Sequence, residues 1–272
     1  IRASRSQATP PRTPFRAALI ALAVVGLVLL TLPTAVLVWR ASGAGDALDE
    51  PRTREALGEA LRLSLVTSTI ALAVIVLVGT PIAFILARSR GLLARLADAL
   101  VDLPIILPPA VAGIALLTVF GRNGVLGDVL ETLGIPVAFS TAAVVIAQVF
   151  VGAPFFIRTA RAGFMRVDQA LEEVGADLGA SPWRVFSRIT LPMARNSLVA
   201  GAVLAWARAL GEFGATIMFA GNRQGVTQTM PLAIYERFGA GDMPAALLLS
   251  AILLGASVIF LFAIRVVGDP ER

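Results

Sequence analysis

The chain has 272 residues, of which 57% are hydrophobic, and its formal net charge is +5. The mean hydropathy of +0.83 is far above that of an ordinary soluble domain and indicates a polytopic membrane protein. Cysteine, histidine and lysine are absent, which excludes disulfides, the usual zinc ligands and a Ser/Lys catalytic dyad, so neither an enzyme nor a bound cofactor is expected.

The N-terminal part of the chain combines a polar tail with an apolar run. Residues 1–16 are rich in Pro, Ser, Thr and Arg and are expected to form a disordered cytoplasmic tail. Residues 17–39 carry no charge and are long enough to span a bilayer as a helix. A signal peptide is the alternative, but its apolar region is usually only about 7 to 15 residues long. We therefore expect residues 17–39 to be retained as the first transmembrane helix.

A second span is predicted at residues 63–87, after a polar stretch. A short interfacial helix is expected to start at Glu50-Pro51 and to lead into this span. Within the span, Gly79-Thr80-Pro81 should produce a kink, because proline removes a helical hydrogen bond.

The third span, residues 103–120, begins with prolines at positions 104, 108 and 109, which should prevent a regular helix through its first third. Broken backbone at membrane depth must be buried in protein or line a cavity, so Pro108 and Pro109 are candidates for a translocation path. A proline-rich turn at the membrane surface is the alternative.

Three further spans are expected at residues 135–157, 197–220 and 243–264, the first of them kinked near Gly152 and Pro154. The predicted fold class is therefore all-α, with six transmembrane helices and a membrane core over residues 53–268.

The longest polar segment between the predicted spans is residues 168–192. Asp168 should cap a short helix that carries Glu172 and Glu173 in its first turn, and Gly179 should end it. Ser181-Pro182 is typical of a second helix start, and Leu191-Pro192 should stop that helix before the next span. Because the segment is structured, it is predicted to be a docking surface rather than a spacer.

This segment resembles the EAA loop of bacterial ABC-transporter permeases. Glu173, Gly179 and the sequence Ile189-x-Leu191-Pro192 keep the spacing of that motif, while Glu173-Val174-Gly175 replaces Glu-Ala-Ala. The resemblance implies that the loop inserts into a cleft of a separate ATPase subunit. The residues expected to make this ATPase-coupling surface are Glu173, Gly179, Ala180, Ser181, Trp183, Arg184, Ile189, Leu191 and Pro192. An amphipathic hairpin lying on the lipid surface is the alternative.

Two charges lie inside the fifth predicted span. Arg208 and Glu212 are four residues apart and can pair on one helix face, and Gly211 and Gly214 should let another backbone approach closely. Ionisable groups at this depth usually face a bundle interior or an aqueous path, so this segment is the candidate translocation path. A purely structural ion pair is the other interpretation, since the carboxylate would cancel much of the field of the arginine.

This span and the proline-rich sequence before it resemble the molybdate branch of the oxyanion permeases, which also includes sulfate and tungstate relatives. The resemblance implies the type I ABC importer fold and a homodimer joined to two copies of an ATPase. It also implies an extracytoplasmic oxyanion-binding protein, with molybdate the expected anion and sulfate or tungstate the alternatives. Because the chain has no lysine, it cannot carry a Walker A loop of its own, and ATP hydrolysis would have to come from a partner.

The arginine distribution predicts the orientation of the chain in the bacterial inner membrane. With the N-terminus inside, the cytoplasmic segments hold 15 of the 23 arginines, the outer segments hold 7, and Arg208 lies within the membrane. Both termini and residues 168–192 should then be cytoplasmic. The positive charge is attributed to this bias and not to nucleic-acid binding.

A carrier driven by an ion gradient, with Glu212 as proton site, is a less favoured alternative. Such a carrier would have no need of a glycine-hinged helix pair with the spacing of the EAA loop.

Overall fold

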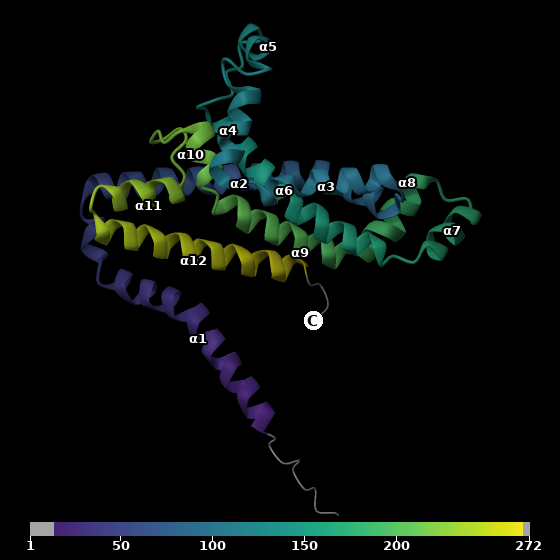
Figure 1. Ribbon diagram of the computed structural model, residues 1–272, viewed down its shortest axis with the longest axis horizontal. Helices are drawn as coiled ribbons and strands as arrows, with labels where there is room; N and C mark the ends of the chain where they lie inside the picture. Colours follow the sequence, from purple (N-terminus) through teal and green to yellow (C-terminus); the bar gives the residue numbers. More distant parts are fainter. Residues whose placement is uncertain (1–13, 269–272) are drawn as a thin grey trace, which may run out of the picture.

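The computed structural model describes residues 14–268, and within this range the chain is built of helices and short connections, without a strand. Most of the expected N-terminal tail, residues 1–13, lies outside the described residues. Three long helices form the body: α2 (Pro51–Arg88), α6 (Thr141–Met165) and α9 (Leu191–Leu210). They pack lengthwise, with α12 (Met243–Gly268) beside α9 (Figure 1).

The contact between α6 and α9 is close because small residues lie in it. A Cβ atom added at Gly152 would come within 3.1 Å of the Ala205 carbonyl oxygen, and one at Gly201 would come equally near the Phe156 carbonyl oxygen. Glycine on each side thus lets the two backbones approach, as is common between membrane helices. The buried Phe156 ring packs into the same core, so the centre of the body is closely packed.

Helix α2 is longer than the sequence predicted. Its start at Pro51 agrees with the expected helix start, but the interfacial helix and the second span form one continuous helix of 38 residues. At 1.5 Å per residue it is about 57 Å long, well beyond the thickness of the hydrocarbon core. The helix continues through Pro81, where the Thr80 hydroxyl donates to the Val76 carbonyl oxygen at 2.6 Å.

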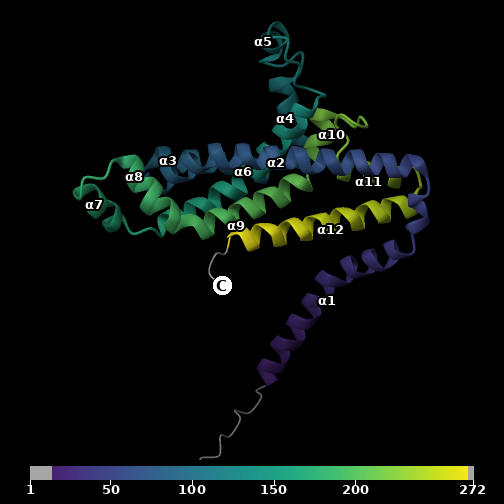
Figure 2. The ribbon, with the colours of Figure 1, turned by 180° about the vertical axis from the view of Figure 1, so that it is seen from behind.

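The third predicted span is two helices and not one. Helix α3 (Leu92–Ile106) includes Pro104, and α4 (Pro109–Phe120) follows after a bend of 115°. The expectation that Pro104 disrupts the helix was wrong, whereas Pro108 and Pro109 do mark the break. Two consecutive prolines lack N–H donors and restrict the residue before them, so the helix ends there. Helix α4 therefore projects from the long body, with α5 (Gly127–Thr132) at its tip (Figure 2).

Two further predicted boundaries need correction. Helix α6 begins at Thr141 instead of residue 135 because Ser140 caps it, and it runs past Pro154 to Met165. The fifth predicted span is also broken: α9 ends at Leu210, and α10 (Gly214–Ala220) follows at an angle of 57°.

Helix α1 (Pro14–Ser42) contains the expected first span and leaves the body at an angle (Figure 1). A short 3₁₀ turn (Gly45–Leu48) joins it to α2. Helix α11 (Met230–Gly239) packs against α2 and α12. Among the described residues, four helices are long and apolar enough to cross a membrane, or up to six if each bent pair counts as one span. The higher number agrees with the six spans that the sequence predicted.

Candidate functional site

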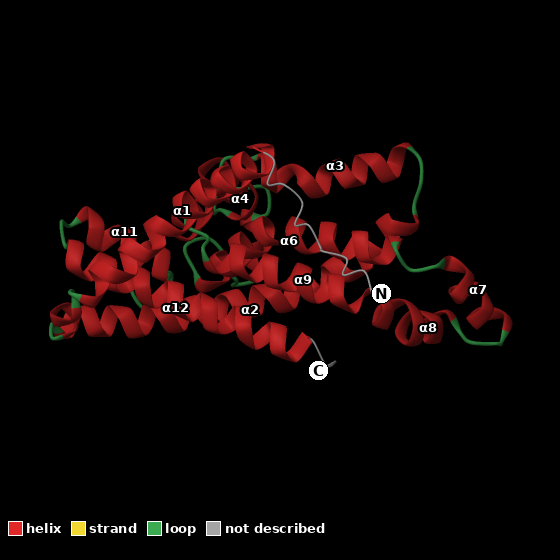
Figure 3. Ribbon diagram, turned by 90° about the horizontal axis from the view of Figure 1, so that it is seen from below, coloured by secondary structure: helices red, strands yellow, loops and turns green. Residues whose placement is uncertain are grey.

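The polar segment 168–192 forms a helical hairpin at one end of the body, opposite α11 (Figure 3). It consists of α7 (Gln169–Asp177) and α8 (Pro182–Val185). The Asp168 carboxylate accepts from the Ala170 N–H at 3.0 Å, and the Ser181 hydroxyl oxygen accepts from the Arg184 N–H at 3.4 Å. Gly179 lies between the two helices with φ +82°, a conformation that disfavours side chains with a Cβ. The predicted caps and hinge are thus confirmed.

The end of the hairpin differs from the prediction. Leu191-Pro192 does not stop the helix, because a π-helical turn (Phe186–Thr190) leads directly into α9. The Leu191 N–H donates to the Phe186 carbonyl oxygen, five residues earlier. Pro192 then occupies the first turn of α9, where proline is tolerated. The hairpin is therefore continuous with the membrane helix α9.

One side of the hairpin is open. Leu178, Trp183 and Val174 are 83%, 72% and 55% exposed, which is unusual for apolar side chains outside a lipid environment. Of the nine residues predicted to couple to a partner, Glu173, Gly179, Ser181, Trp183, Arg184 and Pro192 are exposed, and Ala180, Ile189 and Leu191 are half-buried. The geometry thus provides a mixed apolar and charged surface that can receive a partner.

The other side of the hairpin packs inward at Gly175. A Cβ atom at this position would lie 2.8 Å from Ile189 Cδ1, so glycine makes room for the isoleucine side chain. Gly175, which stands in place of the second alanine of Glu-Ala-Ala, therefore allows close packing between α7 and the π-helical turn.

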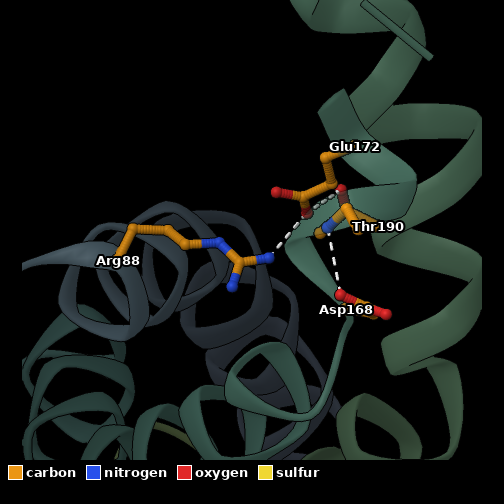
Figure 4. Close-up of polar contacts among 5 residues, drawn as sticks. Arg88, Asp168, Glu172 and Thr190 are labelled. Carbon is orange, nitrogen blue, oxygen red and sulfur yellow. Dashed lines mark hydrogen bonds and ion pairs between the residues drawn. The ribbon is translucent and has the colours of Figure 1, made fainter. Parts of the chain in front are cut away.

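The carboxylate of Glu172, predicted only as a first-turn acid of α7, lies on the inner side of the hairpin. Glu172 Oε1 accepts from Arg88 Nη2 and from the Thr190 hydroxyl, at 2.6 Å in each case (Figure 4). Arg88 is the last residue of α2, and Thr190 ends the π-helical turn before α9. The sequence offered no signal for this contact, because Arg88 lies 84 residues before Glu172.

The second candidate region is the break between α9 and α10. Arg208 Nη1 lies 2.6 Å from Glu212 Oε2, which confirms the predicted pair. The Glu212 side chain is 1% exposed and the Arg208 side chain 31%. Glu212 Oε1 also accepts from the Ala215 N–H at 2.7 Å, so the carboxylate joins the end of α9 to the first turn of α10. Glu212 therefore helps to hold the bend between α9 and α10, and it also pairs with the charge of Arg208.

The two breaks in the chain meet each other. A Cβ atom at Gly214 would lie 2.5 Å from Pro109 Cβ, so α10 and α4 touch where each begins. The expected close approach is thus confirmed at Gly214. The expectation of a close approach was wrong at Gly211. The nearest atom to a Cβ added there is the carbonyl oxygen of Ala207, in the preceding helix α9, at 3.6 Å. Pro108, Pro109 and Gly211 are exposed around this junction, while Glu212 is buried beneath it.

Two ion pairs between α3 and α6 were not predicted. Arg158 Nε lies 3.1 Å from Asp102 Oδ1, and Arg161 pairs with Asp98. Both arginines directly follow the fourth predicted span, residues 135–157, and were expected among the cytoplasmic arginines. The spacings of three residues between the arginines and four between the aspartates are typical of one helix face in each case, but they do not specify that the two faces meet.

The chain matches the family described as binding-protein-dependent transport system inner membrane component over residues 79–269. It is 44% identical over 243 residues to the molybdenum transport system permease protein ModB of Mycobacterium tuberculosis, which covers 87% of the chain and 89% of that protein. It is 38% identical to the sulfate transport system permease protein CysT of Escherichia coli over 187 residues, covering 69% and 68% of the two chains.

Solved structures of importers share the fold. A bacterial ABC transporter involved in the import of the acidic polysaccharide alginate superposes with a TM-score of 0.74 at 16% identity, covering 96% of this chain and 97% of that one. The MetNI methionine ABC transporter superposes with a TM-score of 0.56 at 20% identity, covering 81% and 95%.

Proposed function

Because this chain belongs to the family of binding-protein-dependent transport system inner membrane components, it is a transport subunit and not an enzyme, and we propose that it imports molybdate. The observation that carries the choice of molybdate is the 44% identity to a molybdenum permease over 89% of that protein. Sulfate is the second candidate, since a sulfate permease is similar over a shorter part of the chain.

The proposed assembly is a dimer of this chain with two copies of an ATPase and an extracytoplasmic binding protein. Absence of lysine supports a separate ATPase, because a phosphate-binding loop needs that residue. The alginate transporter was solved in complex with its substrate-bound periplasmic protein, which supports the same arrangement here.

The hairpin of α7 and α8 is the proposed docking surface for the ATPase. Exposed Trp183 and Leu178 can fill a cleft on the partner, and exposed Glu173 and Arg184 can form charged contacts around them. The continuity of α8 with α9 supports coupling, since movement of the docked hairpin would be passed to a membrane helix.

The junction of α4 and α10 is the proposed constriction of the translocation path. Exposed Pro108, Pro109 and Gly211 would line it, and Arg208 would present the exposed part of its side chain. Buried Glu212 offsets most of that charge, which suits a path that must release an anion and not retain it. In this proposal the pair is chiefly structural.

The proposed orientation in the bacterial inner membrane has both termini and the hairpin in the cytoplasm. It rests on the arginine bias between the two sides.

The test of function is a purified complex of this chain with its ATPase, reconstituted in liposomes. ATP hydrolysis is measured with the binding protein and molybdate, tungstate or sulfate in parallel. Stimulation by molybdate at the lowest concentration is expected. Stimulation by sulfate alone would overturn the proposed substrate, and failure of the chain to retain any ATPase would overturn the proposed assembly.

A further inference from the structure

One carboxylate oxygen joins the hairpin to the membrane body at two points. Glu172 lies on α7, Arg88 at the end of α2, and Thr190 immediately before α9 (Figure 4). Both oxygen-to-donor distances are 2.6 Å. The side chains of Arg88 and Glu172 are only 18% and 19% exposed, and Thr190 is 1% exposed, so the contact is largely shielded from water. Such shielding strengthens a charged hydrogen bond relative to one at the surface.

The surroundings of Arg88 hold this contact in place. Its guanidinium carbon lies 5.8 Å from the centre of the Phe84 ring, within cation–π range. The Phe84 ring meets the rings of Phe164 on α6 and Phe186 on the π-helical turn edge to face. The arginine is thus anchored on a packed aromatic cluster, so a force on Glu172 reaches α2 and α9 together.

The neighbouring acid lies in a different environment. Glu173 is exposed, and no hydrogen bond or ion pair found among the described residues involves it. Consecutive residues on a helix point about 100° apart, so Glu173 faces a different direction from Glu172. One acid therefore faces the body, and the other faces outward on the docking surface.

We propose that Glu172 is a positioning residue that transmits displacement of the hairpin to α2 and α9, while Glu173 serves contact with the partner. This proposal rests on the proposed function of the hairpin as the ATPase-docking surface. If the contact between Glu172 and Arg88 were lost, no other ion pair among the described residues would join α7 to α2. The docked ATPase could then hydrolyse ATP without moving the membrane helices.

The test compares Glu172→Gln with Glu173→Gln, the same chemical change at adjacent positions. Arg88→Gln and the double variant Arg88→Gln/Glu172→Gln complete a cycle, and Thr190→Val removes one hydrogen bond with little change in shape. Each reconstituted complex is assayed for retained ATPase and for substrate moved per ATP hydrolysed. The substrate is molybdate, or whichever of tungstate and sulfate stimulates the wild type. Cleavage by trypsin after Arg184 and Arg188, both exposed, reports how firmly the hairpin is held.

For Glu172→Gln we expect normal retention of the ATPase, faster cleavage of the hairpin, and about a tenfold fall in substrate moved per ATP, the factor that corresponds to 1.4 kcal/mol. Arg88→Gln should match it, and the double variant should be no worse than either single one, because all three lose the same contact. Thr190→Val should show a smaller loss of the same kind. Glu173→Gln should instead retain less ATPase, with unchanged cleavage of the free chain.

Wild-type transport per ATP in Glu172→Gln and Thr190→Val, with normal assembly, would overturn the proposal. So would additive losses in the double variant. If Glu173→Gln and Trp183→Ala both retained the ATPase fully, the docking surface itself would be refuted, which is a different result from failure of Glu172 alone.

Discussion

Replacing Arg208 by leucine should destabilise the protein more than replacing Glu212 by glutamine. The difference follows from exposure: the Glu212 side chain is 1% exposed, whereas that of Arg208 is 31% exposed. Without Arg208, a buried carboxylate keeps only the Ala215 N–H as partner. Without the charge of Glu212, the arginine can still be partly hydrated, and glutamine can still accept from Ala215.

The magnitudes can be set from these contacts. Removing one partner of a buried pair costs about 3 to 5 kcal/mol, and we expect Arg208→Leu to cost about 3 kcal/mol because the pair is only partly buried. Losing one charged hydrogen bond costs about 2 kcal/mol, which is the expectation for Glu212→Gln. The double variant leaves no buried charge and should cost about 1 kcal/mol, less than either single change.

The assay is folded yield and thermal midpoint of detergent-extracted protein, measured by size-exclusion chromatography. Successive variants should differ by about 1 kcal/mol, which alters the folded-to-unfolded ratio by roughly 5-fold, so the order of the three variants should be measurable. Losses that simply add in the double variant would show that the two side chains do not interact. A larger loss for Glu212→Gln than for Arg208→Leu would refute the argument from exposure.

The same double variant separates packing from transport. If Arg208 also faces the passing anion, the double variant should fold and move the anion slowly. Full transport by that variant would exclude Arg208 from the path and leave the pair as packing alone.

Three further predictions concern orientation, the hinge and the junction. A single cysteine at Ser89 should resist an impermeant thiol reagent in intact cells, and one at Ser42 should react; the opposite pattern would reverse the orientation. Gly179→Val should cost about 1 to 2 kcal/mol locally because of its positive φ, with lower ATPase retention while the chain still inserts, and wild-type transport would contradict this. Gly214→Ala should lower the thermal midpoint by the equivalent of about 1 to 3 kcal/mol through contact with α4, whereas Gly211→Ala, with space around it, serves as the control; equal effects would contradict the contact.

Local interactions were readable from the sequence alone. The Asp168 and Ser181 caps, the positive φ of Gly179 and the pairing of Arg208 with Glu212 each depend on residues within four positions of one another. Hydropathy likewise predicted the membrane spans, because a helix in lipid needs a long apolar run whatever it packs against.

Tertiary structure decided the rest. The sequence predicted both acids in the first turn, but α7 begins at Gln169 and its first turn holds only Glu172. Which of the two acids faces the body depends on how α7 docks. The pairs of α3 with α6 join residues more than 50 positions apart, and no local pattern specifies such a contact. The breaks at Pro108 and Gly211 have angles of 115° and 57°, and α4 packs against α10 where the two breaks meet. Prolines and glycines permit a bend, but its direction depends on contacts that these residues alone do not specify.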